Sequence, residues 1–319
     1  MQINEIHQKS QQICDNMERV IVGKREVLEY VLSAFLAGGH VLLEDVPGTG
    51  KTVLAKSLAA SFGMTFKRVQ FTPDLLPSDV TGIHYFNQKT SEFEFRPGGI
   101  FSNILLADEI NRATPRTQSS LLECMEEKQA TIDGETMQVG EPFFVIATQN
   151  PVETSGTFPL PEAQLDRFML KLSMGYPDED SERMLLTRFV NEGDVLNTLN
   201  PVCNSGEFLD MQSSCENVVV HEVILQYVLD IAKKSRENKN LAMGVSPRGA
   251  IALVKMARCF AAVQGSEFVT ADMVKKLVPL VFSHRIILED QFASHKTSED
   301  YIREILGTVE APTEEAFKK

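Results

Sequence analysis

The stretch Val41-Leu42-Leu43-Glu44-Asp45-Val46-Pro47-Gly48-Thr49-Gly50-Lys51-Thr52 decides the fold of this chain. The apolar run over 40–44 predicts a buried strand, and residues 51–62 have the apolar spacing of a helix. The glycine-bearing loop between them therefore follows a strand and opens a helix, which is the setting that a Walker A phosphate loop requires. Because successive backbone N–H groups at a helix N-terminus attract anions, this loop predicts a site for the phosphates of a nucleotide.

The residue types in this loop match the chemistry of binding a triphosphate. Gly48 and Gly50 let the backbone approach the phosphates closely, since neither carries a side chain. Lys51 reaches the β- and γ-phosphates, and the hydroxyl of Thr52 is a ligand for Mg²⁺. The general pattern has glycine at position 45, where this chain has Asp45. The loop therefore predicts bound ATP or ADP with Mg²⁺, with one departure from the general motif.

A pair of carboxylates stands at the end of a second apolar run. Residues 103–107 predict a buried strand that ends at Asp108 and Glu109. Taken alone, such a pair is typical of a solvated strand end. Together with the upstream phosphate loop it indicates a Walker B motif, in which Asp108 holds Mg²⁺, commonly through water, and Glu109 activates the attacking water. A kinase would not need the neighbouring glutamate, so the pair favours hydrolysis.

Three further polar residues are candidates for the same site. Asn150 follows an apolar run over 143–148 and is either a turn former before proline or a residue that positions water and senses the γ-phosphate. Arg167 forms either a structural salt bridge or an arginine finger aimed at the γ-phosphate of a neighbouring subunit. Arg248 begins a helix after Ser246-Pro247 and is either a surface residue or within reach of phosphate.

Apolar strands alternate with helices through the first half of the chain, which predicts a parallel sheet covered on both faces. After two helices over 1–37, the expected strands are 40–44, 66–71, 103–107, 143–148 and 168–172. Turn residues between short runs predict hairpin inserts near 83–95 and 130–139. The second half is expected to hold a polar loop over 191–214 and otherwise only helices, at about 180–192, 219–236, 248–263, 270–287 and 298–307. We thus expect an α/β nucleotide-binding core over 1–178 and a helical lid domain over 179–319.

The composition is that of an ordinary folded protein. The chain has 319 residues, of which 43% are hydrophobic and 24% charged, and its net charge is -13. An acidic chain lacks the overall basic footprint of a non-specific nucleic-acid binder, although one face can still carry a basic patch. Five cysteines without a C-x-x-C pair favour buried, reduced thiols over disulfides. The sequence shows no signal peptide and no apolar run of about 20 residues, so we expect a cytoplasmic protein without a membrane span.

These motifs together resemble those of the AAA+ ATPases, and specifically of the MoxR family. The resemblance runs almost without interruption from about Val20 to Pro177 and returns at 244–250. Its most specific part is Gln70-Phe71-Thr72-Pro73-Asp74-Leu75-Leu76-Pro77-Ser78-Asp79-Val80-Thr81-Gly82, which belongs to no general nucleotide-binding motif. It continues through Ala107-Asp108-Glu109-Ile110-Asn111-Arg112-Ala113, Ala147-Thr148-Gln149-Asn150-Pro151 and Leu160-Pro161-Glu162-Ala163-Gln164-Leu165-Asp166-Arg167-Phe168.

The resemblance implies residue roles that spacing alone does not show. Residues 20–23 would form the adenine-side wall, Arg167 would be the finger, and Arg248 would be sensor 2. The catalytic set is then Glu109, Asn150, Arg167 and Arg248. The nucleotide-binding set is Val22, Gly23, Pro47, Gly48, Thr49, Gly50, Lys51, Thr52, Val53 and Asp108, with Thr52 and Asp108 as the Mg²⁺ residues.

The resemblance also implies a place for each of the two hairpin inserts. The insert near 83–95 would face the pore of a ring, and the one near 130–139 would be the pre-sensor insertion. In relatives with that second insertion the helical lid is displaced. Arg248 therefore acts either on the nucleotide of its own chain or on that of a neighbour, and both arrangements stay open.

The resemblance finally implies ATP-driven, chaperone-like remodelling or maturation of a client complex by a homo-oligomeric, hexameric ring. Such proteins often work beside a protein with a von Willebrand factor A domain, and the residues do not identify the client. A DNA-dependent AAA+ motor stays open, although both halves of the chain are acidic and a nucleic-acid partner is not expected. A metal-chelatase motor subunit is disfavoured by the stretch 70–82. A nucleotide-gated scaffold without hydrolysis is a further alternative.

Overall fold

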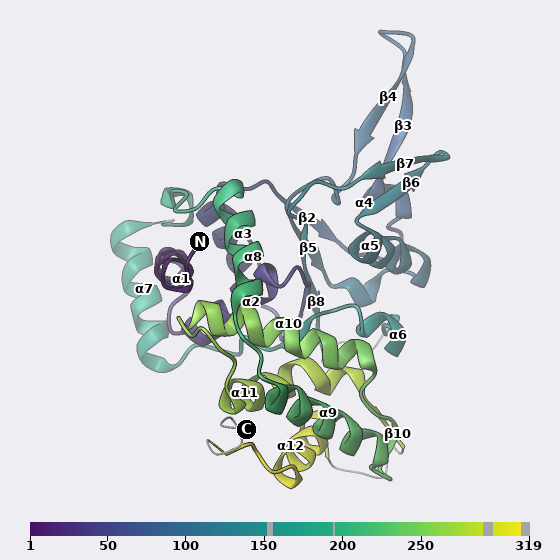
Figure 1. Ribbon diagram of the computed structural model, residues 1–319. Coiled ribbons are helices and arrows are strands. Elements are labelled where there is room, and N and C mark those ends of the chain that lie inside the picture. The colour runs from purple at the N-terminus through teal and green to yellow at the C-terminus, as the bar shows by residue number, and fades with distance from the viewer. Residues whose placement is uncertain (152–155, 194, 290–295, 314–319) are drawn as a thin grey trace.

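The computed structural model describes residues 1–151, 156–193, 195–289 and 296–313, and its centre is a five-stranded parallel sheet (Figure 1). All five predicted strands are confirmed, as β1 (Val41–Glu44), β2 (Phe66–Gln70), β5 (Ile104–Asp108), β8 (Phe144–Gln149) and β9 (Leu170–Leu172). Their order across the sheet is β2-β5-β8-β1-β9. The carboxyl ends of β5, β8 and β1 therefore lie side by side, and the loops that follow these strands meet at one edge of the sheet.

Helices cover this sheet and continue through the second half of the chain (Figure 1). In the first half they are α1 (Ile3–Glu18), α2 (Arg25–Leu36), α3 (Lys51–Phe62), α4 (Pro77–Thr81), η1 (Ile110–Arg112), α5 (Pro115–Glu127) and α6 (Glu162–Leu165). In the second half they are α7 (Glu179–Glu192), η2 (Val195–Thr198), α8 (Ser205–Ser214), η3 (Cys215–Asn217), α9 (Glu222–Glu237), α10 (Pro247–Val263), α11 (Ala271–Phe282), η4 (Ser283–Arg285) and α12 (Ser298–Thr308). The predicted fold class, an α/β core followed by a helical part, is confirmed.

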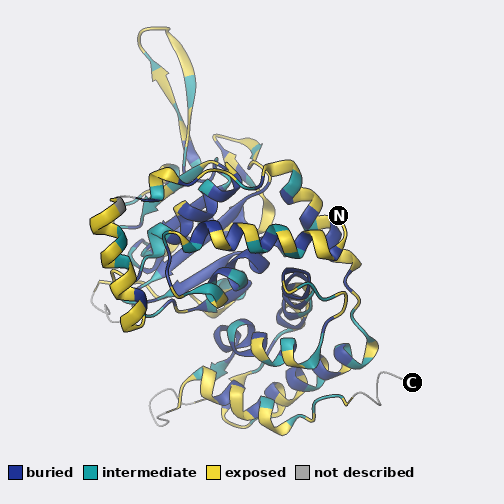
Figure 2. Ribbon diagram, turned by 90° about the vertical axis from the view of Figure 1, so that its left-hand side faces the viewer, coloured by how far each residue is buried: buried dark blue, intermediate teal, exposed yellow. Residues whose placement is uncertain are grey.

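Alternating side chains of the strands build a separate core on each face of the sheet. Leu42 and Leu105 join the apolar side chains of α5 on one face. Leu43 and Leu106 join those of α2 and α3 on the other. All four leucines are fully buried, as expected for a parallel sheet with helices on both sides. Figure 2 shows these buried strands in dark blue, enclosed by helices whose outer surfaces are exposed.

Both predicted hairpins are present. The first, β3 (Gly82–Asn87) with β4 (Glu92–Pro97), projects far from the body of the molecule (Figure 1). The second is β6 (Gln129–Ile132) with β7 (Glu135–Gln138), and its turn residues Asp133 and Gly134 both have positive φ, of 51° and 88°. Two positive φ values in a two-residue turn match the twist of the paired strands, which explains the Asp-Gly sequence.

The prediction of helices alone after residue 180 is wrong in one place. The strands β10 (Leu241–Met243) and β11 (Ile287–Leu288) form an antiparallel pair. The helix expected over 270–287 consequently ends at Phe282. Strands of two or three residues are too short to show an alternating pattern, and their pairing partner lies far away in the sequence.

The polar loop expected over 191–214 also contains a helix, α8. Its start is a capping box, in which Asn204 Oδ1 accepts from the N–H of Glu207 at 3.0 Å and Glu207 Oε2 accepts from the N–H of Asn204 at 2.8 Å. Phe208 and Met211 bury one face of this short helix. The Asn-x-x-Glu spacing was the available signal for it.

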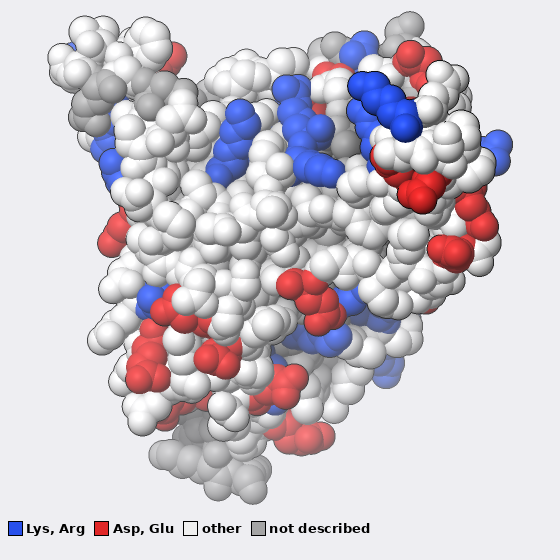
Figure 3. Space-filling view, turned by 90° about the horizontal axis from the view of Figure 1, so that it is seen from above, with Lys and Arg blue, Asp and Glu red and all other residues white. Residues whose placement is uncertain are grey.

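The predicted state of the cysteines is confirmed, because all five are buried and none forms a disulfide. In the described part of the chain, every helix is too short or too polar to cross a lipid bilayer. Figure 3 shows basic side chains in separate patches among large uncharged areas, with acidic groups elsewhere on the same face.

Candidate active site

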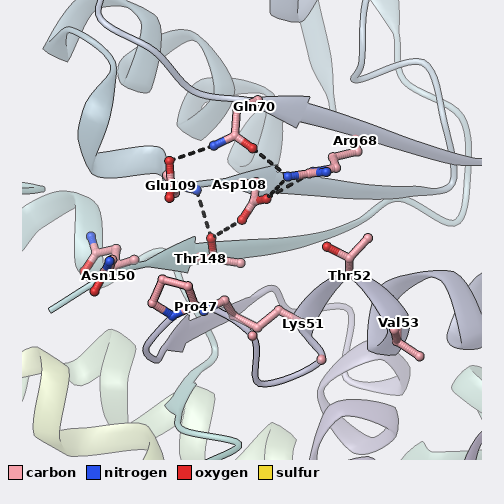
Figure 4. Close-up of a pocket in the computed structure, with 13 residues that line it drawn as sticks. Pro47, Lys51, Thr52, Val53, Arg68, Gln70, Asp108, Glu109, Thr148 and Asn150 are labelled. Atoms are coloured by element: carbon pink, nitrogen blue, oxygen red, sulfur yellow. Dashed lines mark hydrogen bonds and ion pairs between the residues drawn. The ribbon is translucent and has the colours of Figure 1, made fainter. Parts of the chain in front are cut away.

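A cavity of about 410 Å³ opens where β1, β5 and β8 end (Figure 4). Residues from the predicted phosphate loop, from the predicted Walker B pair and from β2 and β8 surround it. They are Pro47, Gly48, Gly50, Lys51, Thr52, Val53, Arg68, Gln70, Asp108, Glu109, Thr148, Gln149 and Asn150. The fold thus brings both predicted motifs to one cavity from segments that are far apart in the sequence.

The phosphate loop has a backbone shape that suits an anion. Gly48 and Gly50 have φ values of 88° and 92°, in the left-handed region that favours glycine. A Cβ at position 48 would meet no atom within 4 Å, so the loop leaves open space beside its backbone. Gly50 directly precedes α3, and the N-terminus of this helix therefore lies at the cavity. Thr49, which does not line the cavity, closes the turn through its hydroxyl.

The Lys51 ammonium group lies across this loop. Its Nζ donates to the backbone oxygens of Asp45 and Val46, each at 2.9 Å. Both acceptors are neutral carbonyls, and a phosphate oxygen is a stronger, charged acceptor. The lysine is thus placed where an arriving triphosphate can replace the two carbonyls as its partner.

Asp45, the departure from the general motif, has a structural explanation. Its buried carboxylate accepts from Ser173 Oγ at 2.7 Å and from the N–H groups of Met174 and Gly175 at 2.5 and 3.1 Å. These three residues follow β9 and lead to α7. The carboxylate therefore ties the phosphate loop to the end of the α/β core, and a glycine could form none of these hydrogen bonds.

Both carboxylate oxygens of Asp108 are engaged. Thr148 Oγ1 donates to Oδ1 at 2.6 Å. Arg68 donates to Oδ2 from Nη2 at 2.6 Å and from Nε at 3.0 Å (Figure 4). Arg68 comes from β2 and Thr148 from β8, the two strands that flank β5. Since Asp108 is only 9% exposed, the arginine compensates a negative charge that burial would otherwise penalise.

Glu109 is held by its backbone and by its side chain. Its φ of 56° is left-handed, a conformation that costs a non-glycine residue on the order of 1 kcal/mol or more. Its N–H donates to Thr148 Oγ1 at 2.8 Å. Its Oε2 accepts from Gln70 Nε2 at 2.8 Å and from Arg112 Nη1 at 2.9 Å. The carboxylate consequently points toward Gln70 at the wall of the cavity (Figure 4).

Asn150 lies directly after β8, is buried, and lines the same cavity. Val53 and Pro47 also line it. Val22 and Gly23, predicted at the adenine side, lie in the turn between α1 and α2 and are not among the residues that line this cavity, so their predicted role stays a prediction. A Cβ on Gly23 would lie 2.1 Å from Ser181 Oγ, so the close approach of α7 to this turn requires glycine.

The oxygen atoms at this cavity fit a bound Mg²⁺ ion. Thr52 supplies a hydroxyl and Asp108 a carboxylate, the hard oxygen ligands that this ion prefers. Mg²⁺ commonly keeps several waters and adds phosphate oxygens to one or two protein ligands. The residues that the structure describes contain no group of three or more His, Cys, Asp or Glu that could form a complete metal cage, and a Mg–nucleotide site needs none.

Arg167 and Arg248 lie at a second cavity, of about 260 Å³, whose described lining shares no residue with the first. Both arginines contact Glu126 of α5. Arg167 Nε lies 3.1 Å from Oε2, and Arg248 Nη1 lies 3.1 Å from Oε1. The structure thus brings the two predicted arginines together, but away from Lys51 and the Walker B pair.

Sequence reasoning missed Arg68, Gln70 and Thr148, which form the hydrogen-bond network around the two carboxylates. Arg68 and Gln70 are two residues apart on β2 and therefore lie on the same face of the strand. Polar residues alternating at the end of a predicted strand were the available signal. Thr148 gave a weaker signal, because a threonine at the end of an apolar strand is common.

Comparisons with known proteins place this architecture in a class. Residues 40–170 match the family described as "ATPase family associated with various cellular activities (AAA)", and residues 233–305 match an "AAA lid domain". The fold and the phosphate site therefore define an AAA ATPase core followed by its lid.

Relatives along the whole chain define the family within this class. Chaperone MoxR1 from Mycobacterium tuberculosis is 38% identical and the match covers 97% of this chain and 83% of that protein. Uncharacterized protein YeaC from Bacillus subtilis is 48% identical, over 97% of both chains. A crystal structure of a protein assigned as an ATPase, from Cytophaga hutchinsonii, has a TM-score of 0.90 and 35% identity, covering 98% of this chain and 97% of that one. The chain belongs to the MoxR family of AAA+ ATPases.

Proposed function

We propose that this protein is a Mg²⁺-dependent ATPase whose ring places each nucleotide between two copies of the chain. One observation carries the proposal: Lys51, Asp108 and Glu109 share one cavity, whereas Arg167 and Arg248 lie at another. An arginine finger supplied by a neighbouring subunit contributes about 10³–10⁵ to the rate of such hydrolyses. One chain thus carries the nucleotide-binding residues at one cavity and the arginines at another. Copies that associate head to tail in a ring would bring the arginines of one copy to the nucleotide of the next.

The residues of the first cavity supply the local chemistry. Lys51 and the N–H groups at the start of α3 bind the phosphate oxygens, and Glu109 accepts a proton from the water that attacks the γ-phosphorus. Asn150 orients that water. Mg²⁺, held by Thr52 and Asp108, would neutralise charge on the phosphate oxygens when bound. The products are ADP and inorganic phosphate.

The second cavity supplies the positive charge that hydrolysis needs at the γ-phosphate. Arg167 and Arg248 of one copy act on the nucleotide of the next, which assigns both arginines to action in trans. The chemical step then requires assembly, since a single chain lacks these cations at its own cavity. Preorganised cations at a site that excludes water stabilise the transition state most strongly.

The work done by hydrolysis is remodelling or maturation of a client protein complex by a hexameric ring in the cytoplasm. A relative named as a chaperone supports this part of the proposal. The projecting β3–β4 hairpin also supports it, because Phe86 and Phe93 are 51% and 73% exposed there and offer an apolar surface to a polypeptide. A partner with a von Willebrand factor A domain is proposed from the family alone. Stimulation of hydrolysis by DNA, lost at high salt, would instead favour a DNA motor.

The test mixes two variants that are each inactive. Arg167→Ala keeps a complete nucleotide cavity and lacks the finger, whereas Glu109→Gln keeps the arginines and lacks the base. Each variant alone should release phosphate very slowly. Their mixture should recover activity, with a maximum near equal proportions, because a Glu109→Gln copy then donates Arg167 to the intact cavity of its neighbour.

Two controls make the outcome clear. Arg303→Ala changes an exposed arginine of α12 and should leave the rate of phosphate release normal. Mixing this variant with the unmodified chain should not change that rate. Light scattering must show that the two variants enter the same particles. If mixed particles form and no ratio restores activity, the action in trans is wrong.

A further inference from the structure

Glu126 connects the two arginines through a single carboxylate. One oxygen contacts Nε of Arg167 and the other contacts Nη1 of Arg248, each at 3.1 Å. Within the described residues, neither arginine makes another ion pair or side-chain hydrogen bond. The two terminal nitrogens of Arg167, and Nη2 and Nε of Arg248, can therefore donate to a further acceptor. The three side chains belong to α5, to the segment after α6 and to α10, so the carboxylate joins the core to the second half of the chain.

The charges at this place explain why a carboxylate is needed between the arginines. Lys255 lines the same cavity as both of them. The neighbouring carboxylate, Asp166, is already paired with Arg285 at 2.7 Å. Two guanidinium groups side by side repel each other, and Glu126 compensates one of their charges and leaves a net positive pair. Such a pair still attracts the γ-phosphate of a neighbouring copy.

The helix that carries Glu126 begins close to the Walker B pair. The turn η1 follows Glu109 directly, and Pro115 starts α5. The amide of Gln118, fully buried, donates to the backbone oxygens of Ile110 and Ala113, each at 3.1 Å, which fixes the start of α5 to this turn. From Pro115 to Glu126 the helix rises about 17 Å. The helix α5 thus connects the turn that follows Glu109, a residue of the first cavity, to Glu126 at the second.

We infer that Glu126 is a positioning residue that holds Arg167 and Arg248 as a pair for the nucleotide of the neighbouring copy. The inference rests on the proposed action of the arginines in trans. A purely structural salt bridge would stabilise the contact between α5 and α10 without affecting the chemical step at another copy. The positioning role and the purely structural role therefore predict different results. Only the positioning role predicts that loss of Glu126 slows hydrolysis at the neighbouring copy.

The experiment compares Glu126→Gln with Glu127→Gln, which removes the same charge from the adjacent exposed position of α5. Glu126→Gln keeps the side-chain volume and should lower kcat by about tenfold to a hundredfold, since displacement by about 1 Å can cost that much. The KM for ATP should stay close to normal, because the nucleotide binds at the other cavity. Glu127→Gln should keep both constants, and Glu126→Asp should show an intermediate kcat.

Mixing then locates the defect. Glu126→Gln subunits have an intact nucleotide cavity, so adding Glu109→Gln subunits, which have intact arginines, should raise the turnover per Glu126→Gln subunit. Normal kcat for Glu126→Gln would overturn the inference, and so would a low kcat that mixing does not raise. If Arg167→Ala is restored in the same mixing experiment while Glu126→Gln is not, only the role of Glu126 is wrong. If neither variant is restored, the action in trans fails as well.

Discussion

Arg68 Nη2 lies 2.6 Å from Asp108 Oδ2, so the guanidinium group forms an ion pair with the carboxylate that we propose as a Mg²⁺ ligand. The two residues come from adjacent parallel strands, β2 and β5. The side chain of Arg68 is 48% exposed, whereas that of Asp108 is 12% exposed. An arginine that reaches inward from the surface can leave without disturbing the core, and a hydrated metal ion can then take its place.

Replacing Arg68 should change the response to Mg²⁺. In Arg68→Met the competing ion pair is absent, so the Mg²⁺ concentration that gives half-maximal ATP hydrolysis should fall by about two- to fivefold, the size expected for a partly exposed ion pair. A Mg²⁺ titration at saturating ATP measures this. Arg303→Met on α12 is the matched control and should not shift the midpoint. A higher midpoint for Arg68→Met would mean that the arginine assists metal or phosphate binding.

Glu109→Gln should separate binding from hydrolysis. An amide cannot accept the proton of the attacking water, and loss of a general base lowers kcat by about 10²–10⁴. The amide can still contact Gln70 and Arg112, so binding of ATP should persist. Phosphate release and equilibrium binding of a fluorescent ATP analogue test the two parts. Glu123→Gln, an exposed position on α5, should behave as the unmodified protein, and normal turnover of Glu109→Gln would refute the assigned role.

Asp45→Ala should destabilise the protein, although Asp45 is itself a departure from the general motif. The substitution leaves the N–H groups of Met174 and Gly175 without their acceptor, and we expect a loss of about 3 kcal/mol in unfolding free energy. Urea unfolding measures the loss. Asp210→Ala, an exposed aspartate on α8, should change stability by less than about 0.5 kcal/mol. Equal unfolding midpoints for both variants would contradict the tie between the phosphate loop and the segment after β9.

Stability should fall in mild acid because of His40. Burial lowers the pKa of His40 to about 4, and the hydrogen bond to the Met125 oxygen only partly opposes this. The neutral ring donates from Nε2 to that oxygen at 3.1 Å and accepts from the N–H of Val145 at Nδ1 at 3.0 Å, so protonation would remove the acceptor. Since an unfolded histidine has a pKa near 6.5, its contribution is complete above about pH 6.5 and is lost as the pH falls toward 4, by about 3 kcal/mol.

The variant His40→Gln isolates this contribution. Glutamine does not titrate in this range, so its unfolding free energy should depend less steeply on pH between 6.5 and 4 than that of the unmodified chain. Part of the acid sensitivity should remain, because burial also lowers the pKa of His284. Urea unfolding at a series of pH values measures both slopes. Identical slopes would show that His40 is not buried in its neutral form.

Much of the core was predictable because its signals are local. An apolar run followed by a glycine loop is enough to predict β1, and apolar runs that end at polar residues are enough for β5 and β8. The hairpin β6–β7 was predictable from its Asp-Gly turn. The strand pair β10–β11 was not, since two short segments form it only when the chain brings their backbones together.

The residues of the candidate site likewise fall into those that the sequence predicted and those that it did not. Lys51, Thr52, Asp108 and Glu109 are recognisable by their position after a strand or before a helix, because a phosphate loop and a strand end are local structures. The partners of the carboxylates, Arg68 and Thr148, depend on the order of the strands in the sheet. Strand order is set by packing between distant segments, which composition and spacing do not report.

The sequence by itself determined a strand, a glycine loop and a helix in succession, an acidic strand end and the family, since each of these is encoded in consecutive residues. Only the tertiary structure decided that Arg167 and Arg248 meet at Glu126, away from the cavity of Lys51. The physical reason is that side chains from three separate segments come within hydrogen-bond distance only after both faces of the sheet are packed. Burial of apolar surface drives that packing, and it sets which charges face each other.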